Sequence, residues 1–350
     1  MSSFAETMWK SWQGEYEYKS PVCHIDKWVI FLMKKILIII AAILAVTVAV
    51  PVTLLIQYGK YEKPTPESEE TISVYVTSED KVVDMSKSQY LKEVVSAEMP
   101  ASFEPEALKA QAVAARSYLE ARRGAYRTSG TPAEHKGADI CTDSTHCKAW
   151  ISEEKRRESW GKDADKNWEK ISAAVEETAD EVMTYNGEVI SAVFHSTSSG
   201  KTESSKDVWG GDRPYLVSVD SPGDLQSPKY KSEKEMTLEE FKKIAAENIE
   251  GVNFSKEIVG NIARSEAGGI LTVSVGGVPV KGTKFRSLYG LRSTNAEVTV
   301  DGEMVYFHVT GYGHGVGMSQ YGANYLAAEG KKYDEILKTY YTGIEIIKLN

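Results

Sequence analysis

The sequence predicts an α+β fold, namely mixed helices and short strands in an extracytoplasmic domain, preceded by one transmembrane helix. Helical and strand patterns are interspersed after residue 70, without the regular alternation that is typical of βαβ units. Before them runs a charge-free stretch of 21 residues, Ile36–Ile56, close to the ~20 apolar residues that span a bilayer. A chain of 350 residues with 42% hydrophobic content can also bury a substantial core.

The apolar stretch is expected to be a single-pass anchor at residues 36–57. Lys34 and Lys35 directly precede it, whereas the lysines that follow it are interspersed with glutamates, which offset their positive charge. The positive-inside rule therefore makes residues 1–35 a cytoplasmic tail at the cell membrane. A cleaved signal peptide is the alternative, but the segment before the apolar run is too long for one. Residues 58–71 would then be a linker and residues 72–350 the extracytoplasmic domain.

Charge and cysteine content narrow the classes of protein to consider. The formal net charge of −9 argues against a nucleic-acid binder, which would need a basic surface. Cys23, Cys141 and Cys147 are the only cysteines, too few for a disulfide scaffold in a chain of this length.

The first half of the domain is expected to open with a strand at Ile72–Val83 and two helices that end at about Arg123. Residues 124–165 are polar and irregular in pattern, so we expect an insertion without a core of its own. Helical periodicity returns at Lys166–Thr184, and Asn186-Gly187 predicts a hairpin turn into a strand that ends at His195.

The second half shows a capping box at Thr237–Glu240, which predicts the start of a helix. Several short strands are expected between Ile258 and Val309. A glycine-dense segment, 311–322, then leads into the last elements. These are a helix to about Glu329, a helix at Tyr333–Tyr341 and a strand at Glu345–Leu349.

One carboxylate in the first helix stands out. Leu91, Val94 and Val95 form an apolar stripe, and the next position on that stripe is Glu98. A carboxylate that points toward a core is costly unless it is paired or protonated. Lys109 and Arg116, seven residues apart, share one face of the following alanine-rich helix. This arrangement suits general acid/base chemistry, although a solvated charge at a helix end is the alternative.

The insertion contains a candidate metal site. His135, Cys141, His146 and Cys147 lie within thirteen residues and offer two imidazoles and two thiolates, the ligand set of a closed tetrahedral zinc site. We expect one structural zinc ion, because four protein ligands leave no position for substrate. A Cys141–Cys147 disulfide is the alternative in an oxidising compartment.

Other catalytic signatures are absent from the sequence. Gly-x-Ser-x-Gly, His-Glu-x-x-His and phosphate-loop motifs do not occur. His195 ends a strand before a hydroxyl-rich loop that starts at Ser196, and His314 lies among four glycines, but a lone histidine is more often structural. Elimination favours carboxylate chemistry with Glu98 as the best-placed acid, and Glu104 and Glu106 as weaker seconds.

Several segments together resemble the stage II sporulation protein D family of endospore-forming bacteria. They occur in order over about residues 90–345, nearly the whole external part. The segments are Tyr90–Pro100, Glu106–Tyr118, Phe194–Ser198, Tyr289–Ser293 and Gly313–Ala323.

The resemblance implies a lytic transglycosylase that cleaves peptidoglycan between N-acetylmuramic acid and N-acetylglucosamine without water. The muramyl 6-hydroxyl closes onto its own anomeric carbon and leaves a 1,6-anhydro end. One carboxyl group, which the resemblance places at Glu98, acts first as acid and then as base. No second carboxylate and no cofactor are then required for the chemistry.

The resemblance also implies further site residues and partners. The substrate groove would include Lys109, Arg116, His195, Ser196, His314 and Gln320. The substrate would be glycan strands stripped of peptides by a partner amidase, stage II sporulation protein P, during engulfment. A membrane scaffold, stage II sporulation protein M, would be a second partner. Some family members resemble this chain in carrying a metal-binding insertion near residues 135–147.

Two other functions remain open from the sequence. A zinc-dependent cell-wall amidase or peptidase would use the histidine–cysteine cluster as its catalytic metal site. A non-catalytic glycan-binding module would position the amidase instead. Hydrolysis rather than transglycosylation is the alternative outcome if Glu98 does act on glycan.

Overall fold

A computed structural model describes residue 28 and residues 31–39 and 70–349 of the chain. The chain divides into two units, Met1–Lys63 and Pro64–Asn350. In the first unit, residues 31–39 are helical and expose apolar side chains. Among the described residues, no helix has the length and apolar character needed to cross a membrane. Most of the predicted span, residues 40–57, lies outside the described residues, as do most of the tail and the linker.

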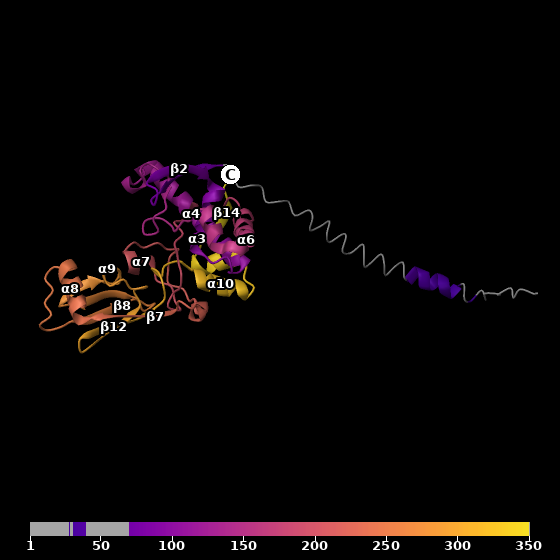
Figure 1. Cartoon of the computed structure of the whole chain (residues 1–350). Helices are drawn as coiled ribbons and strands as arrows, with labels where there is room; N and C mark the ends of the chain where they lie inside the picture. The colour runs from indigo at the N-terminus through magenta and orange to yellow at the C-terminus, as the bar shows by residue number, and fades with distance from the viewer. Residues whose placement is uncertain (1–27, 29–30, 40–69, 350) are drawn as a thin grey trace, which may run out of the picture. The chain divides into compact units, whose positions relative to one another are not determined.

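The described part of the second unit confirms the predicted α+β class, with helices and short strands interspersed along the chain (Figure 1). Its α-helices are α3 (Lys87–Glu98), α4 (Pro105–Ser129), α5 (Glu153–Trp160), α6 (Ala164–Glu176), α7 (Ser205–Trp209), α8 (Leu238–Asn248), α9 (Gly282–Leu288), α10 (Gln320–Ala328) and α11 (Tyr333–Tyr340). Short 3-10 helices are η1 (Ala133–His135), η2 (Gly161–Asp163) and η3 (Pro222–Gln226).

The strands form several small sheets of two or three strands each. They are β1 (Thr71–Val76), β2 (Lys81–Ser86), β3 (Ile140–Cys141), β4 (Glu181–Tyr185), β5 (Glu188–Val189), β6 (Phe194–His195), β7 (Lys231–Thr237), β8 (Val259–Arg264), β9 (Ile270–Val275), β10 (Val278–Lys281), β11 (Ala296–Asp301), β12 (Met304–Thr310), β13 (Met318–Ser319) and β14 (Glu345–Lys348).

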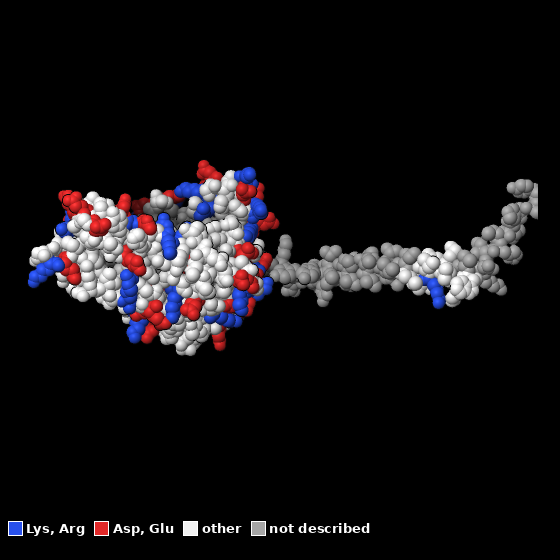
Figure 2. Space-filling view, turned by 90° about the horizontal axis from the view of Figure 1, so that it is seen from below, with Lys and Arg blue, Asp and Glu red and all other residues white. Residues whose placement is uncertain are grey.

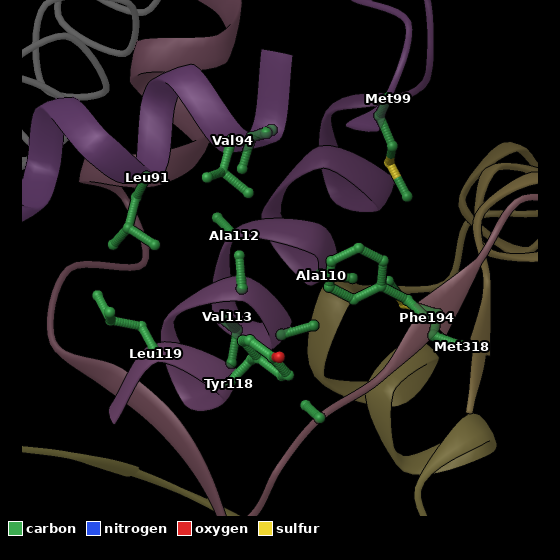
Figure 3. Packing of buried hydrophobic residues seen from close by; sticks show 14 of the residues in the cluster. Leu91, Val94, Met99, Ala110, Ala112, Val113, Tyr118, Leu119, Phe194 and Met318 are labelled. Carbon is green, nitrogen blue, oxygen red and sulfur yellow. The ribbon is translucent and has the colours of Figure 1, made fainter. Parts of the chain in front are cut away.

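The first of two hydrophobic cores surrounds α4, which packs against α3, α6, α10 and α11. Pro105 occupies the first turn of α4, where its missing N–H costs no hydrogen bond. Buried alanines along α4 allow the neighbouring helices to approach closely. Figure 3 shows this packing, with Leu91 and Val94 of α3 facing Ala112 and Val113 of α4. The predicted helix pair is confirmed, and α4 runs six residues beyond the expected end at Arg123.

The predicted single strand at Ile72–Val83 is wrong, because the segment folds into the β1–β2 hairpin. Asp80 adopts a φ of +52° in the turn. Aspartate tolerates this left-handed conformation better than most residues. The alternating pattern of Ile72, Val74 and Val76 covers only the first strand, so periodicity alone could not reveal the reversal.

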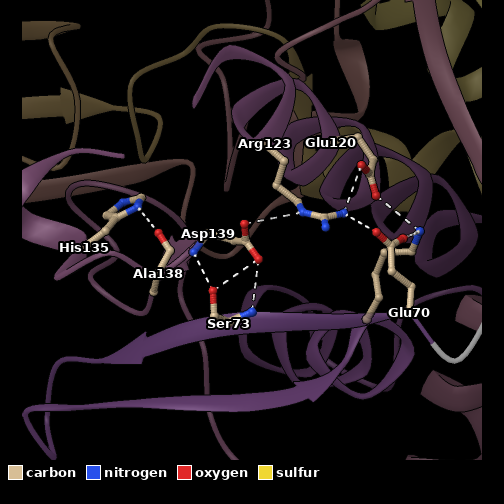
Figure 4. Close-up of polar contacts among 8 residues, drawn as sticks. Glu70, Ser73, Glu120, Arg123, His135, Ala138 and Asp139 are labelled. Carbon is tan, nitrogen blue, oxygen red and sulfur yellow. Dashed lines mark hydrogen bonds and ion pairs between the residues drawn. The ribbon is translucent and has the colours of Figure 1, made fainter. Parts of the chain in front are cut away.

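The segment 124–165, predicted as an insertion without a core of its own, is connected to the first core. Strand β3 pairs in parallel with β1, and Ile140 and Cys141 are buried in the first core. Figure 4 shows that Asp139 bonds Ser73 on β1 and lies 3.7 Å from Arg123 of α4. Arg123 also reaches Glu70 at 2.7 Å, so an ion network fixes β1 to α4. Two residues of strand pairing were too short a signal to detect.

The second core lies within residues 231–309 and contains the sheets β10-β9-β8 and β11-β12-β7. Thr237 caps α8 by accepting a hydrogen bond from the N–H of Glu240, as the capping box predicts. The expected strands between Ile258 and Val309 are confirmed, and α9 is an additional helix. On the face shown in Figure 2, basic and acidic side chains are interspersed rather than gathered into a basic stripe.

Candidate functional site

Glu98 is the last residue of α3, on the helix face that packs toward α4. The side chains of Leu91, Val94 and Val95 on that face are buried, while Glu98 is half-buried. Met99 leaves the helix in extended conformation before Pro100. The apolar stripe therefore places the carboxyl group at the edge of the core, where it still reaches a pocket.

Two hydrogen bonds hold the Glu98 carboxyl group. The backbone N–H of Ala149 donates to Oε1 at 3.0 Å, and Nε2 of Gln320 donates to Oε2 at 3.3 Å. Burial raises the pKa of Glu98 above its ordinary value, and the charge of Lys148 and the two hydrogen bonds only partly oppose this shift. Burial therefore dominates, and the raised pKa is the direction that a general acid requires.

The cation near Glu98 is Lys148, which the sequence did not indicate. Its Nζ lies 3.8 Å from the ring centroid of Phe194 and 4.2 Å from that of Tyr118. Burial lowers the pKa of Lys148 to about 8, although the charge of Glu98 opposes the shift. Lys148 is thus still charged at neutral pH and favours the ionised form of Glu98.

Lys109 and Arg116 lie elsewhere than the predicted site. Lys109 makes ion pairs with Glu106 at 3.0 Å and with Glu177 at 2.6 Å. Arg116 is fully buried and donates to the backbone carbonyls of Glu181 and Val175. Their shared helix face therefore meets α6 and β4, and these contacts hold the core together.

Gln320 is the predicted groove residue that the structure brings to Glu98. It begins α10, directly after Ser319, whose side chain caps that helix. Its Nε2 also lies 3.5 Å from Oε1 of Gln111, a fully buried residue of α4. The Gln320 amide thus spans two helices and aims one donor at the carboxyl group.

His195 and Ser196 lie beside Gln320 because β6 and β13 pair in parallel, with His195 opposite Ser319. His195 is buried and its Nδ1 donates to the carbonyl of Val316 at 3.1 Å. Its Nε2 is buried and has no hydrogen-bond partner among the described residues. Burial lowers the pKa of His195, so the ring is neutral and Nε2 carries a lone pair. The backbone carbonyl of Ser196 accepts from the N–H of Tyr321.

His314 is held near His195, with their ring centroids 5.7 Å apart. Its Nδ1 accepts a hydrogen bond from the N–H of Val316 at 3.1 Å. Burial holds the pKa of His314 well below its ordinary value, so this ring is also neutral. The other side of the ring meets the half-exposed Trp209, at 5.2 Å between centroids.

The glycines around His314 serve backbone packing between the segments 193–198 and 311–317. A Cβ on Gly317 would lie 2.1 Å from the carbonyl oxygen of Val193, and one on Gly313 would lie 2.7 Å from the Cβ of His195. Both glycines also adopt positive φ. The group that approaches these glycines is therefore the protein's own chain.

A cavity of about 680 Å³ is lined in part by Glu98. The chain from Ser96 to Ser102, at the end of α3, forms part of its lining. Among the described residues that line it, Glu98 is the only acid, and four are basic: Arg156, Lys166, Lys170 and Lys229. Trp160 adds an aromatic wall. Neither Glu104 nor Glu106 lines this cavity.

The predicted metal ligands do come together. One ligand atom from each of His135, Cys141, His146 and Cys147 lies within 4.8 Å of the others. Nε2 of His135 is 3.2 Å from Nδ1 of His146 and 3.2 Å from Sγ of Cys147, and Sγ of Cys141 is 3.5 Å from Nδ1 of His146. Both cysteines are free, so the alternative disulfide is not formed.

The three distances between individual ligand atoms are close to those around a four-coordinate metal. A tetrahedral ion with Zn–N of about 2.0–2.1 Å and Zn–S of about 2.3 Å separates its ligand atoms by about 3.3–3.8 Å. Nδ1 of His135 faces the carbonyl of Ala138 at 3.3 Å and donates to it, which leaves Nε2 as the ligand atom. The histidine–cysteine cluster can therefore bind a metal ion with four protein ligands.

The cluster and the Glu98 site share one short segment of chain. Cys147 is followed directly by Lys148 and Ala149, two of the three residues that act on Glu98. Sequence reasoning missed both because they are about fifty positions away and have ordinary residue types. Proximity to a predicted metal ligand was the only signal that could have indicated them.

Comparisons with known proteins show the family to which the chain belongs. The family described as Stage II sporulation protein matches residues 75–185, which include Glu98 and the cluster. Stage II sporulation protein D of Bacillus subtilis is 34% identical over 90% of this chain and 96% of its own length. The protein of the same name from Bacillus amyloliquefaciens is 38% identical over 83% of each chain. An amidase enhancer of Bacillus subtilis is 29% identical over 72% of this chain and 39% of its own length. The chain belongs to the stage II sporulation protein D family, which is involved in sporulation.

Proposed function

We propose that this chain is a peptidoglycan lytic transglycosylase that cleaves peptide-stripped glycan strands between N-acetylmuramic acid and N-acetylglucosamine during engulfment. The observation that carries the proposal is a single half-buried acid, Glu98, with a raised pKa, at the edge of a cavity large enough for sugar rings.

In the first step, protonated Glu98 gives its proton to the glycosidic oxygen, and the bond to the muramyl anomeric carbon breaks. The carboxylate left behind is stabilised by three groups already in place, namely the N–H of Ala149, the amide of Gln320 and the charge of Lys148. Such preorganised donors act where charge develops in the transition state.

In the second step, the muramyl 6-hydroxyl attacks the positively charged anomeric carbon, and the Glu98 carboxylate takes its proton. The enzyme returns to its starting state, and the product carries a 1,6-anhydro ring without consuming water. One carboxyl group serves both steps, so the absence of a second acid among the described cavity residues suits this reaction. Hydrolysis normally needs two flanking carboxyl groups.

The pH dependence of glycan cleavage tests the role of Glu98. Because the general acid must be protonated, kcat/KM should fall as pH rises through the raised pKa of Glu98, above the ordinary range of a glutamate. Lys148→Met should move this falling limb to higher pH, because Lys148 lowers the pKa. It should also reduce kcat. Lys148→Arg keeps the charge and is the control. An unchanged falling limb in Lys148→Met would contradict the assignment of Glu98.

We also propose that the histidine–cysteine cluster binds one structural zinc ion. Two buried thiols and two imidazoles, with ligand atoms within 4.8 Å of one another, support zinc, which favours nitrogen and sulfur ligands. The ion would secure the segment that carries Lys148 and Ala149. Four protein ligands leave no open position, which disfavours a zinc-dependent amidase. We propose further that residues 36–57 anchor the chain in the cell membrane. Its partners would be the amidase, stage II sporulation protein P, and the scaffold, stage II sporulation protein M.

A further inference from the structure

The cavity beside Glu98 is lined by more positive charge than its own residues neutralise. Arg156 of α5, Lys170 of α6 and the neighbouring Lys166 come from consecutive helices, and Lys229 reaches it from the segment after η3. Within the described part of the chain, none of the four forms an ion pair with an acid. Lys148 is the only cation among the groups that shift the pKa of Glu98. The other four line the cavity without shifting the pKa of Glu98.

Arg156 is the least satisfied of these cations. Its Nε is buried without a hydrogen-bond partner among the described residues. Its guanidinium lies 5.4 Å from the ring centroid of Trp160. Burial lowers the pKa of Arg156, with no acid to oppose the shift. An arginine held in this way presents donors to whatever enters the cavity.

The cavity lysines, like Arg156, have no acid as an ion-pair partner among the described residues. Lys170 donates to the backbone carbonyl of Phe103 at 2.5 Å. Burial lowers the pKa of Lys170, the charge of Glu104 opposes this shift, and the charge of Lys166 adds to it. Lys229 lies over the rings of Tyr312 and Tyr321, at 5.5 and 5.9 Å. Four basic residues around a single lining acid, Glu98, leave like charges close together, which destabilises the free protein and is relieved by an anion.

We propose that these residues form a subsite for a substrate carboxylate, the free lactyl group of N-acetylmuramic acid, with Arg156 as its main ligand. This inference rests on the proposed function. The muramyl ring that Glu98 acts on carries its lactyl group on the same ring as the reacting anomeric carbon. In a peptide-stripped strand that group is a carboxylate, and in a peptide-bearing strand it is a neutral amide. The protein would then select stripped strands by recognising the charge of the lactyl carboxylate, in addition to any steric exclusion of the peptide.

The test separates charge from bulk by chemical modification of the substrate. Stripped glycan strands are compared with the same strands after their lactyl carboxylates are converted to methylamides, which removes the charge and adds little volume. Wild-type protein should cleave the carboxylate strands with a kcat/KM about tenfold to a hundredfold higher than that for the methylamide strands. This is the size of effect expected when a hydrogen bond to a charged group is lost. Equal rates on the two strands would overturn the subsite.

Variants assign the effect to particular residues. Arg156→Gln should raise KM for carboxylate strands and leave the rate on methylamide strands nearly unchanged, so that the preference collapses. Lys162→Gln, an exposed lysine of η2 that does not line the cavity, is the matched control and should keep the preference. Equal losses on both strands in Arg156→Gln would contradict charge recognition.

The outcomes also distinguish the subsite from the proposed function. If no strand is cleaved under any condition, the transglycosylase proposal fails. The subsite is then tested separately, by comparing how tightly the carboxylate and methylamide strands bind to the Glu98→Gln protein. Tighter binding of the carboxylate strands, lost in Arg156→Gln, would support it, and equal binding would refute it.

Discussion

Glu98→Gln should abolish glycan cleavage, with a loss of roughly a thousandfold or more in kcat, because one group performs both proton transfers. The amide keeps the shape of the side chain and can still accept the hydrogen bond from Ala149. Strand binding, measured by co-sedimentation with stripped glycan, should therefore remain. A non-catalytic glycan-binding module would also bind strands, but neither its wild-type form nor its Glu98→Gln form would cleave them.

Stability measurements show whether the Glu98→Gln protein is folded. A carboxyl group whose pKa is raised by folding stabilises the protein below its unfolded pKa, and that stability is lost as pH rises through the folded pKa. Glu98→Gln should therefore raise Tm at neutral pH and have little effect at low pH. Glu106→Gln is the matched control, since Glu106 pairs with Lys109 outside the cavity. Its cleavage rate should stay close to that of the wild type. Retained cleavage in folded Glu98→Gln protein would refute the assignment.

Loss of the metal site should have the second largest effect. Cys147→Ser in the full-length chain should lower Tm by on the order of 10 °C, because structural zinc contributes several kcal/mol to folding. Cleavage should fall as well, since Ala149 and Lys148 follow Cys147 directly and hold the carboxylate form of Glu98. Elemental analysis should give about one zinc per chain in the wild type.

The matched control is Cys23→Ser, which removes the third cysteine but no cluster ligand. It should change neither the zinc content nor Tm. The time course of chelation adds a second criterion. Under a structural role, activity should decline together with folding, whereas a catalytic zinc would make activity vanish at once while the protein stayed folded. Chelator-treated protein that keeps its Tm but loses all activity would contradict the structural role.

The sequence predicted the elements whose signals are local. Pro100 and Pro105 defined the boundary between α3 and α4, and Asn186-Gly187 defined the β4–β5 turn, with φ values of +52° and +82°. The β1–β2 reversal and the β1–β3 pairing were missed, because a short turn and a two-residue strand leave no periodic pattern. The two separate cores depend on long-range contacts that periodicity does not encode.

The candidate site divides in the same way. Glu98 could be found because its place on an apolar stripe is a local property, and the metal ligands because four of them lie within thirteen residues. Lys109 and Arg116 do share a helix face, but periodicity could not say that this face meets α6 and β4. Lys148, Ala149 and Gln111 join the site only through tertiary packing.

The most direct test of the Glu98 mechanism is cleavage of stripped glycan strands in water enriched in oxygen-18, followed by mass spectrometry of the products. Transglycosylation predicts muramyl ends one water lighter than reducing ends and free of the heavy isotope, because the attacking oxygen belongs to the substrate. Muramyl reducing ends that carry oxygen-18 at the anomeric carbon would contradict the proposed reaction and show that the enzyme is a hydrolase.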